Sequence, residues 1–231
     1  MICKGVNFDK LIVADNEKCD FEKYIEIKGV YLHKQIYDAF TEYAADTVTY
    51  SELSSVIRYD KNLRDTLYKY LATFEEYLRA NLFAKYDVAN QEYVYKGCKG
   101  FERLKKDIQP KTDYSESNLY YCFQLELSPT IDLFEHIGIY NDTTLSDFRQ
   151  IKELRNQVMH HNVLVLGQST NKEQAETNLQ MLKKQVTLLC KYLPEEYQSG
   201  FQTSIENLNI NKRTEQRYLD KLCLENIEWN I

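Results

Sequence analysis

Apolar residues recur every three or four positions along most of the chain, which is the spacing of helices that bury one face. The clearest stretch is 63–86, where one stripe contains Leu63, Leu67, Leu71, Phe74, Leu78 and Leu82. Glu75 and Arg79 are four residues apart on a flank of this stripe, so their side chains are expected to meet. The pattern predicts a long amphipathic helix here.

The N-terminal part repeats this pattern with an interruption. Residues 21–45 carry apolar side chains at helical spacing, namely Ile25, Val30, Leu32, Ile36, Phe40 and Tyr43. Gly29 is expected to divide them into two helices. In Thr49-Tyr-Ser-Glu-Leu a hydroxyl residue precedes a glutamate by three positions, which is typical of a helix start. Residues 1–20 show no clear period and predict a short strand, an arm or an irregular lead-in.

The C-terminal half predicts further helices. One covers 131–137 after Pro129, and the next ends near His160, with Thr143, Thr144 or Ser146 as its N-cap. Asn171 is expected to cap a long helix that reaches Leu193 and ends before Pro194. The tail from Glu195 predicts one or two more amphipathic helices and contains the only tryptophan, Trp229.

Composition supports an all-α fold. The 231 residues include only 7 Gly and 3 Pro, which argues against a β fold with many tight turns. We expect a single domain over 1–231, with a core at about 20–195 and accessory helices at 196–231. No apolar run approaches the roughly 20 residues of a membrane span, and no signal peptide is visible, so a cytoplasmic location without membrane contact is expected. The six cysteines are expected to be reduced thiols, most of them packed in the core.

The charge distribution restricts nucleic-acid binding to a local patch. The formal net charge is −6, whereas dedicated binders of duplex DNA are usually basic overall. The segment 87–118 is predicted to be irregular and holds the densest basic run: Lys96, Lys99, Arg103, Lys105, Lys106 and Lys111. Two interpretations stay open, a solvated loop and a rim that binds phosphate.

The segment 149–162 carries the candidate chemistry. As a helix it has one apolar stripe of Ile151, Leu154 and Val158, and a second, nearly opposite stripe of Glu153, Asn156 and His160. His160 is therefore expected to point away from the core. The second stripe is either a plain polar surface that ends in two histidines at the C-terminal pole, or part of an active site.

Arg155 and His160 together suit RNA cleavage. An imidazole titrates near neutral pH and can move protons at a ribose hydroxyl, and a guanidinium binds a phosphate through two parallel hydrogen bonds. On a straight helix these two side chains point about 140° apart. Either the helix opens near Met159 or a second subunit completes the site.

Two regions resemble a known family. Arg155-Asn156-x-x-x-His160-His161-Asn162 is similar to the signature of Abi-like proteins, the AbiD/AbiF group of the HEPN superfamily, which is defined by Arg-x(4–6)-His. The stretches from Thr49, from Tyr59 to Arg64 and from Phe74 to Ala80 resemble the central helices of that family in the same order. The resemblance covers about residues 20–195.

The resemblance implies a HEPN-type helical bundle with extra N- and C-terminal helices, a homodimer, and RNA cleavage at the shared interface without metal or cofactor. It implies a role in abortive infection or in a toxin–antitoxin pair, with RNA as substrate or regulator and an antitoxin as a further partner. Arg155, His160 and Asn156 would be catalytic. The resemblance also implies that His161 and the basic run bind the RNA. Glu75, Arg79 and Glu153 would support the catalytic residues. Val163 stands where the family often has arginine, which removes a positive charge.

Two other functions remain open from the sequence. The first is a non-catalytic module that binds RNA or protein through Arg155 and the basic run. The second is a metal enzyme, but the adjacent His160 and His161 project about 100° apart on a helix and do not chelate one ion well. The sequence has no His-Glu-x-x-His motif and no Cys/His cluster. We therefore expect no metal site.

Overall fold

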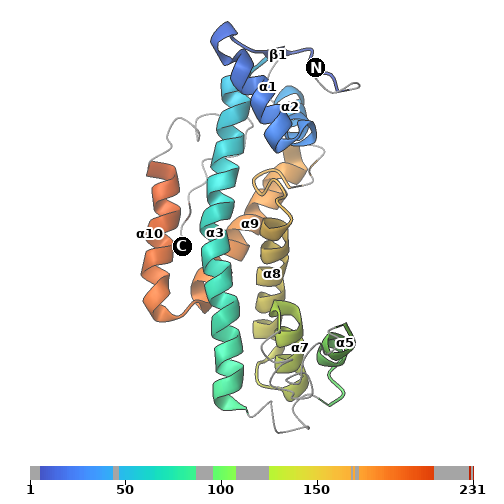
Figure 1. Cartoon of the computed structure of the whole chain (residues 1–231). Helices are drawn as coiled ribbons and strands as arrows, with labels where there is room; N and C mark the ends of the chain where they lie inside the picture. The colour runs from blue at the N-terminus through green and yellow to red at the C-terminus, as the bar shows by residue number, and fades with distance from the viewer. Residues whose placement is uncertain are drawn as a thin grey trace.

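The computed structural model is an all-α helical bundle built around one long central helix (Figure 1). It describes residues 6–43, 47–86, 96–107, 125–167, 169, 172–210, 229 and 231. The helices are α1 (Lys18–Lys28), α2 (Val30–Tyr43), α3 (Tyr50–Lys85), α5 (Lys99–Asp107), α7 (Leu127–Ile137), α8 (Asp142–Met159), α9 (Lys172–Tyr192) and α10 (Glu195–Ile210). None of these helices is long and apolar enough to cross a membrane.

The N-terminal lead-in contains a short strand. β1 (Leu11–Ile12) pairs in parallel with β2 (Val48–Thr49), with Leu11 opposite Val48, and a 3-10 turn η1 (Asp15–Glu17) leads into α1. The predicted break at Gly29 is confirmed, because this residue has φ +89° and separates α1 from α2. Glycine adopts this φ without the steric cost that a Cβ atom brings.

The central helix α3 joins two predicted segments into one helix of 36 residues. The predicted start is confirmed as a capping box, in which the Glu52 N–H donates to Thr49 Oγ1 at 3.3 Å and the Thr49 N–H donates to Glu52 Oε2 at 2.8 Å. The apolar stripe continues without a break through Val56 and Tyr59, and both are fully buried. No Gly or Pro interrupts the stretch, so nothing ends the helix before Lys85.

Two predicted boundaries were wrong. Asn141 caps α8, because its side chain accepts from the Thr144 N–H at 2.9 Å. The predicted caps Thr143, Thr144 and Ser146 all lie within the helix. Helix α7 begins at Leu127 and not at Ile131. Pro129 lies in its first turn, where a backbone N–H has no intrahelical acceptor, so the ring is tolerated there. The expected cap Asn171 lies outside the described residues.

The predicted irregular segment 87–118 was also wrong in part, because 99–107 form the helix α5. Its apolar face is only Phe101 and Leu104, too little for a periodic signal, and Phe101 is fully buried. α5 packs on α7. Gly100 allows this approach, because a Cβ atom there would lie 2.3 Å from Asp132 Oδ2.

The C-terminal region belongs to the same core. α10 packs against α3 and α9, and its Phe201 and Ile205 are fully buried. Trp229 is buried and its indole N–H donates to Tyr59 Oη at 3.3 Å. The described part of the tail thus closes over the side of α3 opposite α8 (Figure 1). Further helices after Ile210 fall outside the described residues.

Candidate active site

The helix α8 presents the motif as the sequence predicted. Ile151, Leu154 and Val158 are buried and Glu153 and His160 are exposed, while Asn156, the third residue of the predicted polar stripe, is half-buried. The helix ends at Met159, and His160 is its C-cap with φ −84° and ψ 6°. His161 follows in the left-handed region at φ +55°, which non-glycine residues adopt at a cost. The helix therefore ends directly before His160, and the backbone leaves the helical course at His161.

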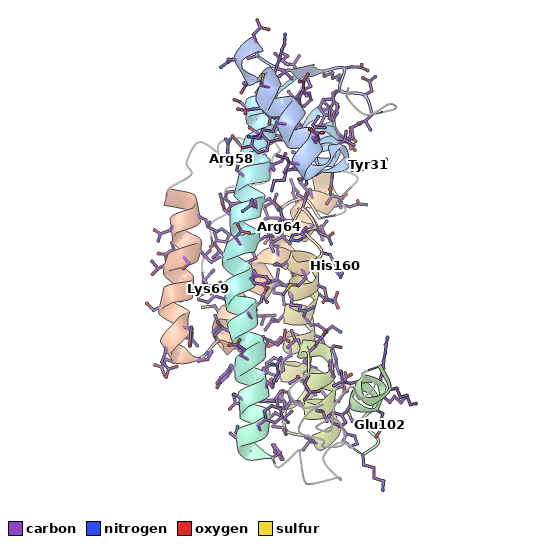
Figure 2. The ribbon with its side chains drawn as sticks, viewed as in Figure 1. Tyr31, Arg58, Arg64, Lys69, Glu102 and His160 are labelled. Atoms are coloured by element: carbon purple, nitrogen blue, oxygen red, sulfur yellow. The ribbon has the colours of Figure 1, made fainter. Side chains whose placement is uncertain are left out.

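Arg155 points toward α3, whereas His160 lies at the open end of α8. The Arg155 Nε atom lies 3.7 Å from Glu75 Oε2, and no hydrogen bond or ion pair joins Arg155 to His160, both of which the structure describes. Figure 2 shows His160 at the edge of the bundle. Within one chain the two predicted catalytic side chains are thus held apart.

Arg155 belongs to a charged cluster of two arginines and one glutamate, with Arg79 and Glu75 as the other members. Arg79 Nη2 donates to Glu75 Oε1 at 3.2 Å, as the four-residue spacing predicted. Two guanidinium groups therefore share one carboxylate. Arg79 Nε and Arg155 Nε are buried and have no hydrogen-bond partner. Because both Nε atoms are enclosed by protein, an anion would bind this cluster through the Nη groups of the Arg79 and Arg155 side chains, which are 27% and 24% exposed.

Burial raises the pKa of Glu75, against the opposing effect of Arg155 and Arg79. A carboxyl group with a higher pKa in the folded state contributes stability at low pH, and this contribution is lost as the pH rises through the folded pKa. We expect wild type to lose stability relative to Glu75→Gln as the pH rises above about 4.3. Urea unfolding of both proteins across this range measures the difference.

Glu76→Gln is the matched control, since Glu76 is the neighbouring residue and is exposed. Its stability at neutral pH should lie within about 0.5 kcal/mol of wild type, as is usual for exposed substitutions. A relative stability of wild type over Glu75→Gln that increases with pH would contradict the assigned environment of Glu75.

A second cluster anchors the loop that follows the motif. Asp60 of α3 is buried and accepts from the backbone N–H groups of Leu164 at 2.6 Å and Val165 at 3.2 Å. Its other oxygen accepts from Arg64 Nε at 2.8 Å. Arg64 Nη1 lies 3.2 Å from His161 Nδ1. One carboxylate thus joins the central helix to the loop and, through Arg64, to the motif.

The contact with Arg64 sets the tautomer of His161. A guanidinium only donates hydrogen bonds, so Nδ1 of His161 accepts, and the neutral ring carries its proton on Nε2. His161 is exposed, so its ring is accessible from solvent. Asp60 and Arg64 belong to a stretch that resembled the family, but sequence reasoning gave them no role. The signal was an aspartate on the buried face of α3, between Val56 and Leu63, where only a partnered charge is stable.

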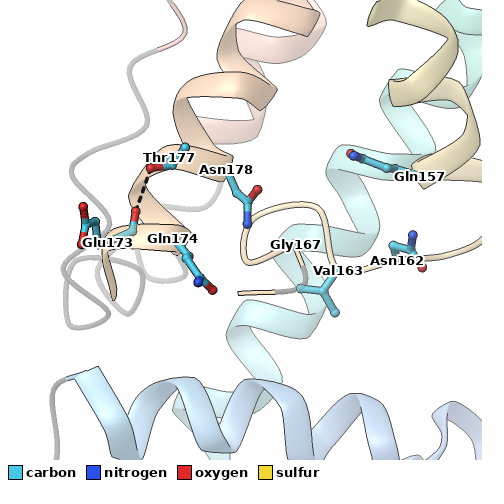
Figure 3. Close-up of a pocket in the computed structure, with 8 residues that line it drawn as sticks. All are labelled: Gln157, Asn162, Val163, Gly167, Glu173, Gln174, Thr177 and Asn178. Carbon is cyan, nitrogen blue, oxygen red and sulfur yellow. Dashed lines mark hydrogen bonds between the residues drawn. The ribbon is translucent and has the colours of Figure 1, made fainter. Parts of the chain in front are cut away.

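A pocket of about 650 Å³ lies beside the motif. Figure 3 shows its lining, which is Gln157, Asn162, Val163, Gly167, Glu173, Gln174, Thr177 and Asn178. Most of these side chains are uncharged amides or hydroxyls, and Val163 is buried in its wall. These described lining residues offer hydrogen-bond donors and acceptors and include no cation, so their chemistry suits neutral polar groups better than phosphate.

The structure does not bring the basic run beside His160. Lys99, Arg103 and Lys106 are exposed on α5, which packs on α7 near the start of α8 (Figure 1). The 18 residues of α8 correspond to about 27 Å between that end and His160. Lys96 is exposed just before α5. The side chain of Lys105 and all of Lys111 lie outside the described residues.

Glu153, the predicted supporting residue on α8, is exposed, and its Oε1 atom lies 3.9 Å from Lys152 Nζ.

Comparisons with protein-family models, with curated proteins and with solved structures gave no match. Among the residues that the structure describes, no group of three or more His, Cys, Asp or Glu side chains is arranged to hold a metal ion.

Proposed function

We propose that this protein is a metal-independent endoribonuclease of phage defence, of the abortive-infection or toxin–antitoxin type, with its site shared between two copies. The observation that carries the proposal is that α8 presents a partly exposed arginine, which shares Glu75 with Arg79, and a solvent-exposed histidine at its C-terminal end. The similarity of the motif to Abi-like proteins supports the same reaction.

The reaction needs only these side chains. A histidine takes the proton of the ribose 2′-hydroxyl, the 2′-oxygen forms a bond to the adjacent phosphorus, and the bond from phosphorus to the 5′-oxygen breaks. The protonated histidine then gives this proton to the leaving 5′-oxygen, so the products are a 2′,3′-cyclic phosphate and a 5′-hydroxyl. Arg155 stabilises the charge that builds up on the phosphate oxygens.

A shared site accounts for the separation of Arg155 and His160 within one chain. In a twofold dimer the two copies present the same surface to each other, so Arg155 of one copy can meet the partner subunit's His160. An exposed aromatic side chain supports contact on this side. Tyr31 of α2 is 80% exposed and lies on the same side of the molecule as His160 in Figure 2.

Arg155→Ala should slow RNA cleavage by about 10²- to 10³-fold, which is the usual cost of removing one group that stabilises the transition-state charge. The measurement is the rate of shortening of end-labelled RNA in EDTA. Arg149→Ala is the control, since Arg149 is an exposed arginine on the same helix, paired with Glu135 at 2.6 Å. Its rate should stay close to wild type.

Two results of this assay would overturn the proposal. One is RNA that migrates more slowly with wild-type protein but stays intact, which would identify a binding module. The other is cleavage by Arg155→Ala at the wild-type rate, which would place the chemistry elsewhere.

A further inference from the structure

A separate pocket of about 380 Å³ lies between α1 and the first turns of α3, at the end of the bundle that holds the N-terminal strand. Its volume is in the lower range of sites for small molecules. Its floor contains two buried polar side chains, His33 at 1% and Tyr50 at 4% exposure. Tyr24 and Ile57 add an aromatic and an apolar wall.

The two floor side chains offer complementary hydrogen bonds. His33 Nδ1 lies 2.9 Å from the Gly29 carbonyl oxygen, which only accepts, so Nδ1 carries the proton and Nε2 is an acceptor. Burial lowers the pKa of His33, which keeps the ring neutral near pH 7. The phenol of Tyr50 is both a donor and an acceptor. Both side chains line the same pocket, so together they offer an acceptor and a donor, which match the N–H and C=O of an amide.

The charges along the pocket are separated by sign. α1 and α3 run in the same direction here, and Ser51 Oγ donates to Glu17 Oε1 at 2.7 Å where both begin (Figure 1). Glu17 and Asp20 line this end. The cations that line the pocket come later on both helices, namely Lys28, Arg58 and Lys61. Burial raises the pKa of Tyr50, and of the charged groups at the two ends Asp20 raises it further while Arg58 lowers it, so both ends of the pocket act on this phenol.

We infer that this pocket binds a short zwitterionic peptide of two or three residues. The free amino group binds the acidic end at Asp20, the carboxylate binds the basic end at Arg58, and a backbone amide pairs with His33 and Tyr50. Glu17 contacts Ser51, Asp20 lies three residues after the first and Arg58 seven residues after the second, so the two ends lie about 6 Å apart along the helices. An extended peptide advances about 3.4 Å per residue, so two or three residues span this separation. Tyr24 and Ile57 favour an apolar side chain on the ligand. This inference is independent of the proposed ribonuclease activity.

The test uses the full chain and the dipeptide Phe-Gly, its N-acetyl form and its C-terminal amide, with Gly-Phe and Leu-Leu as further probes. Isothermal titration should show saturable binding of at least one unmodified dipeptide. Blocking either end of Phe-Gly, or of whichever dipeptide binds, should weaken binding at least about tenfold, because each removes a charge-assisted contact.

Two substitutions assign the ends. Asp20→Asn should weaken binding of the unmodified dipeptide at least about tenfold but leave the affinity for its N-acetyl form unchanged. Arg58→Gln should also weaken binding of the unmodified dipeptide, but leave the affinity for its C-terminal amide unchanged. Glu22→Gln, an exposed glutamate on α1 that does not line the pocket, is the control and should bind like wild type. No saturable binding of any dipeptide would overturn the inference, as would equal binding of the blocked forms or indifference to both substitutions.

Discussion

His160→Ala should cut RNA cleavage by about 10²- to 10⁴-fold, which is the range that general acid–base catalysis supplies. His160 is exposed at the C-cap of α8, where its backbone N–H donates to the carbonyl oxygens of Asn156 and Val158 and its side chain fills no core position. The fold should therefore remain intact. The measurement is the single-turnover rate on end-labelled RNA in EDTA, with the melting temperature of each protein as the check on folding.

His136→Ala is the control for this substitution. His136 is also exposed and lies in the last turn of α7, so it tests the loss of an imidazole near a helix end without touching the motif. Its cleavage rate should equal that of wild type. A His160→Ala protein that cleaves RNA at the wild-type rate would remove His160 from the mechanism.

Asp60→Ala should lower the free energy of unfolding by about 3–5 kcal/mol, the cost of breaking a buried charged pair. The alanine leaves Arg64 without its carboxylate and leaves the Leu164 and Val165 N–H groups without an acceptor. Asp60→Asn keeps the shape and one oxygen acceptor, so it should cost less, about 1.5–3 kcal/mol. Urea unfolding at neutral pH measures both.

Asp65→Ala is the matched control on the same helix. Asp65 is exposed and pairs only with Lys61, one turn before it. Exposed pairs at this spacing contribute about 0.3–0.5 kcal/mol, so the variant should be nearly as stable as wild type. Equal unfolding free energies for Asp60→Ala and Asp65→Ala would show that Asp60 does not anchor the loop after the motif.

The all-α fold followed from the sequence because its evidence is local. Helical spacing, the hydroxyl of Thr49 before Glu52 and the break at Gly29 each act within a few residues, and the structure has all three. The α5 helix was missed because Phe101 and Leu104 make too short an apolar pattern, and its burial depends on α7, which is distant in sequence. The sequence predicted a helix start at Thr49 and a separate helix at 63–86, and their union into α3 was missed because the polar residues between them weaken the apolar pattern.

The candidate site was predictable only where the interacting residues lie on the same helix. The exposed face of Glu153 and His160 and the contact of Glu75 with Arg79 depend on spacing within α8 and α3, and both are present. The link from Asp60 to the backbone at Leu164 spans 104 residues, and no local pattern encodes it. The position of the basic α5 far from His160 likewise depends on how α7 and α8 pack.

The strained backbone at His161 connects these observations. Its left-handed φ is held by contacts on both sides, with Arg64 on its side chain and the loop at Leu164 fixed by Asp60. Strain of this kind persists where the surroundings determine it, and it occurs often at functional sites. In the proposed dimer, Asp60 and Arg64 of the central helix hold the loop after α8 in place, so that His160 stays exposed and can face a second copy.

Complementation between two inactive variants tests the shared site most directly. Arg155→Ala and His160→Ala are co-expressed in equal amounts, purified and assayed on labelled RNA in EDTA. If Arg155 of one copy acts with the partner subunit's His160, half of the dimers are mixed and each mixed dimer keeps one of two sites, so about a quarter of wild-type activity should return. A mixture as inactive as each variant alone, with mixed dimers demonstrably present, would contradict the shared site.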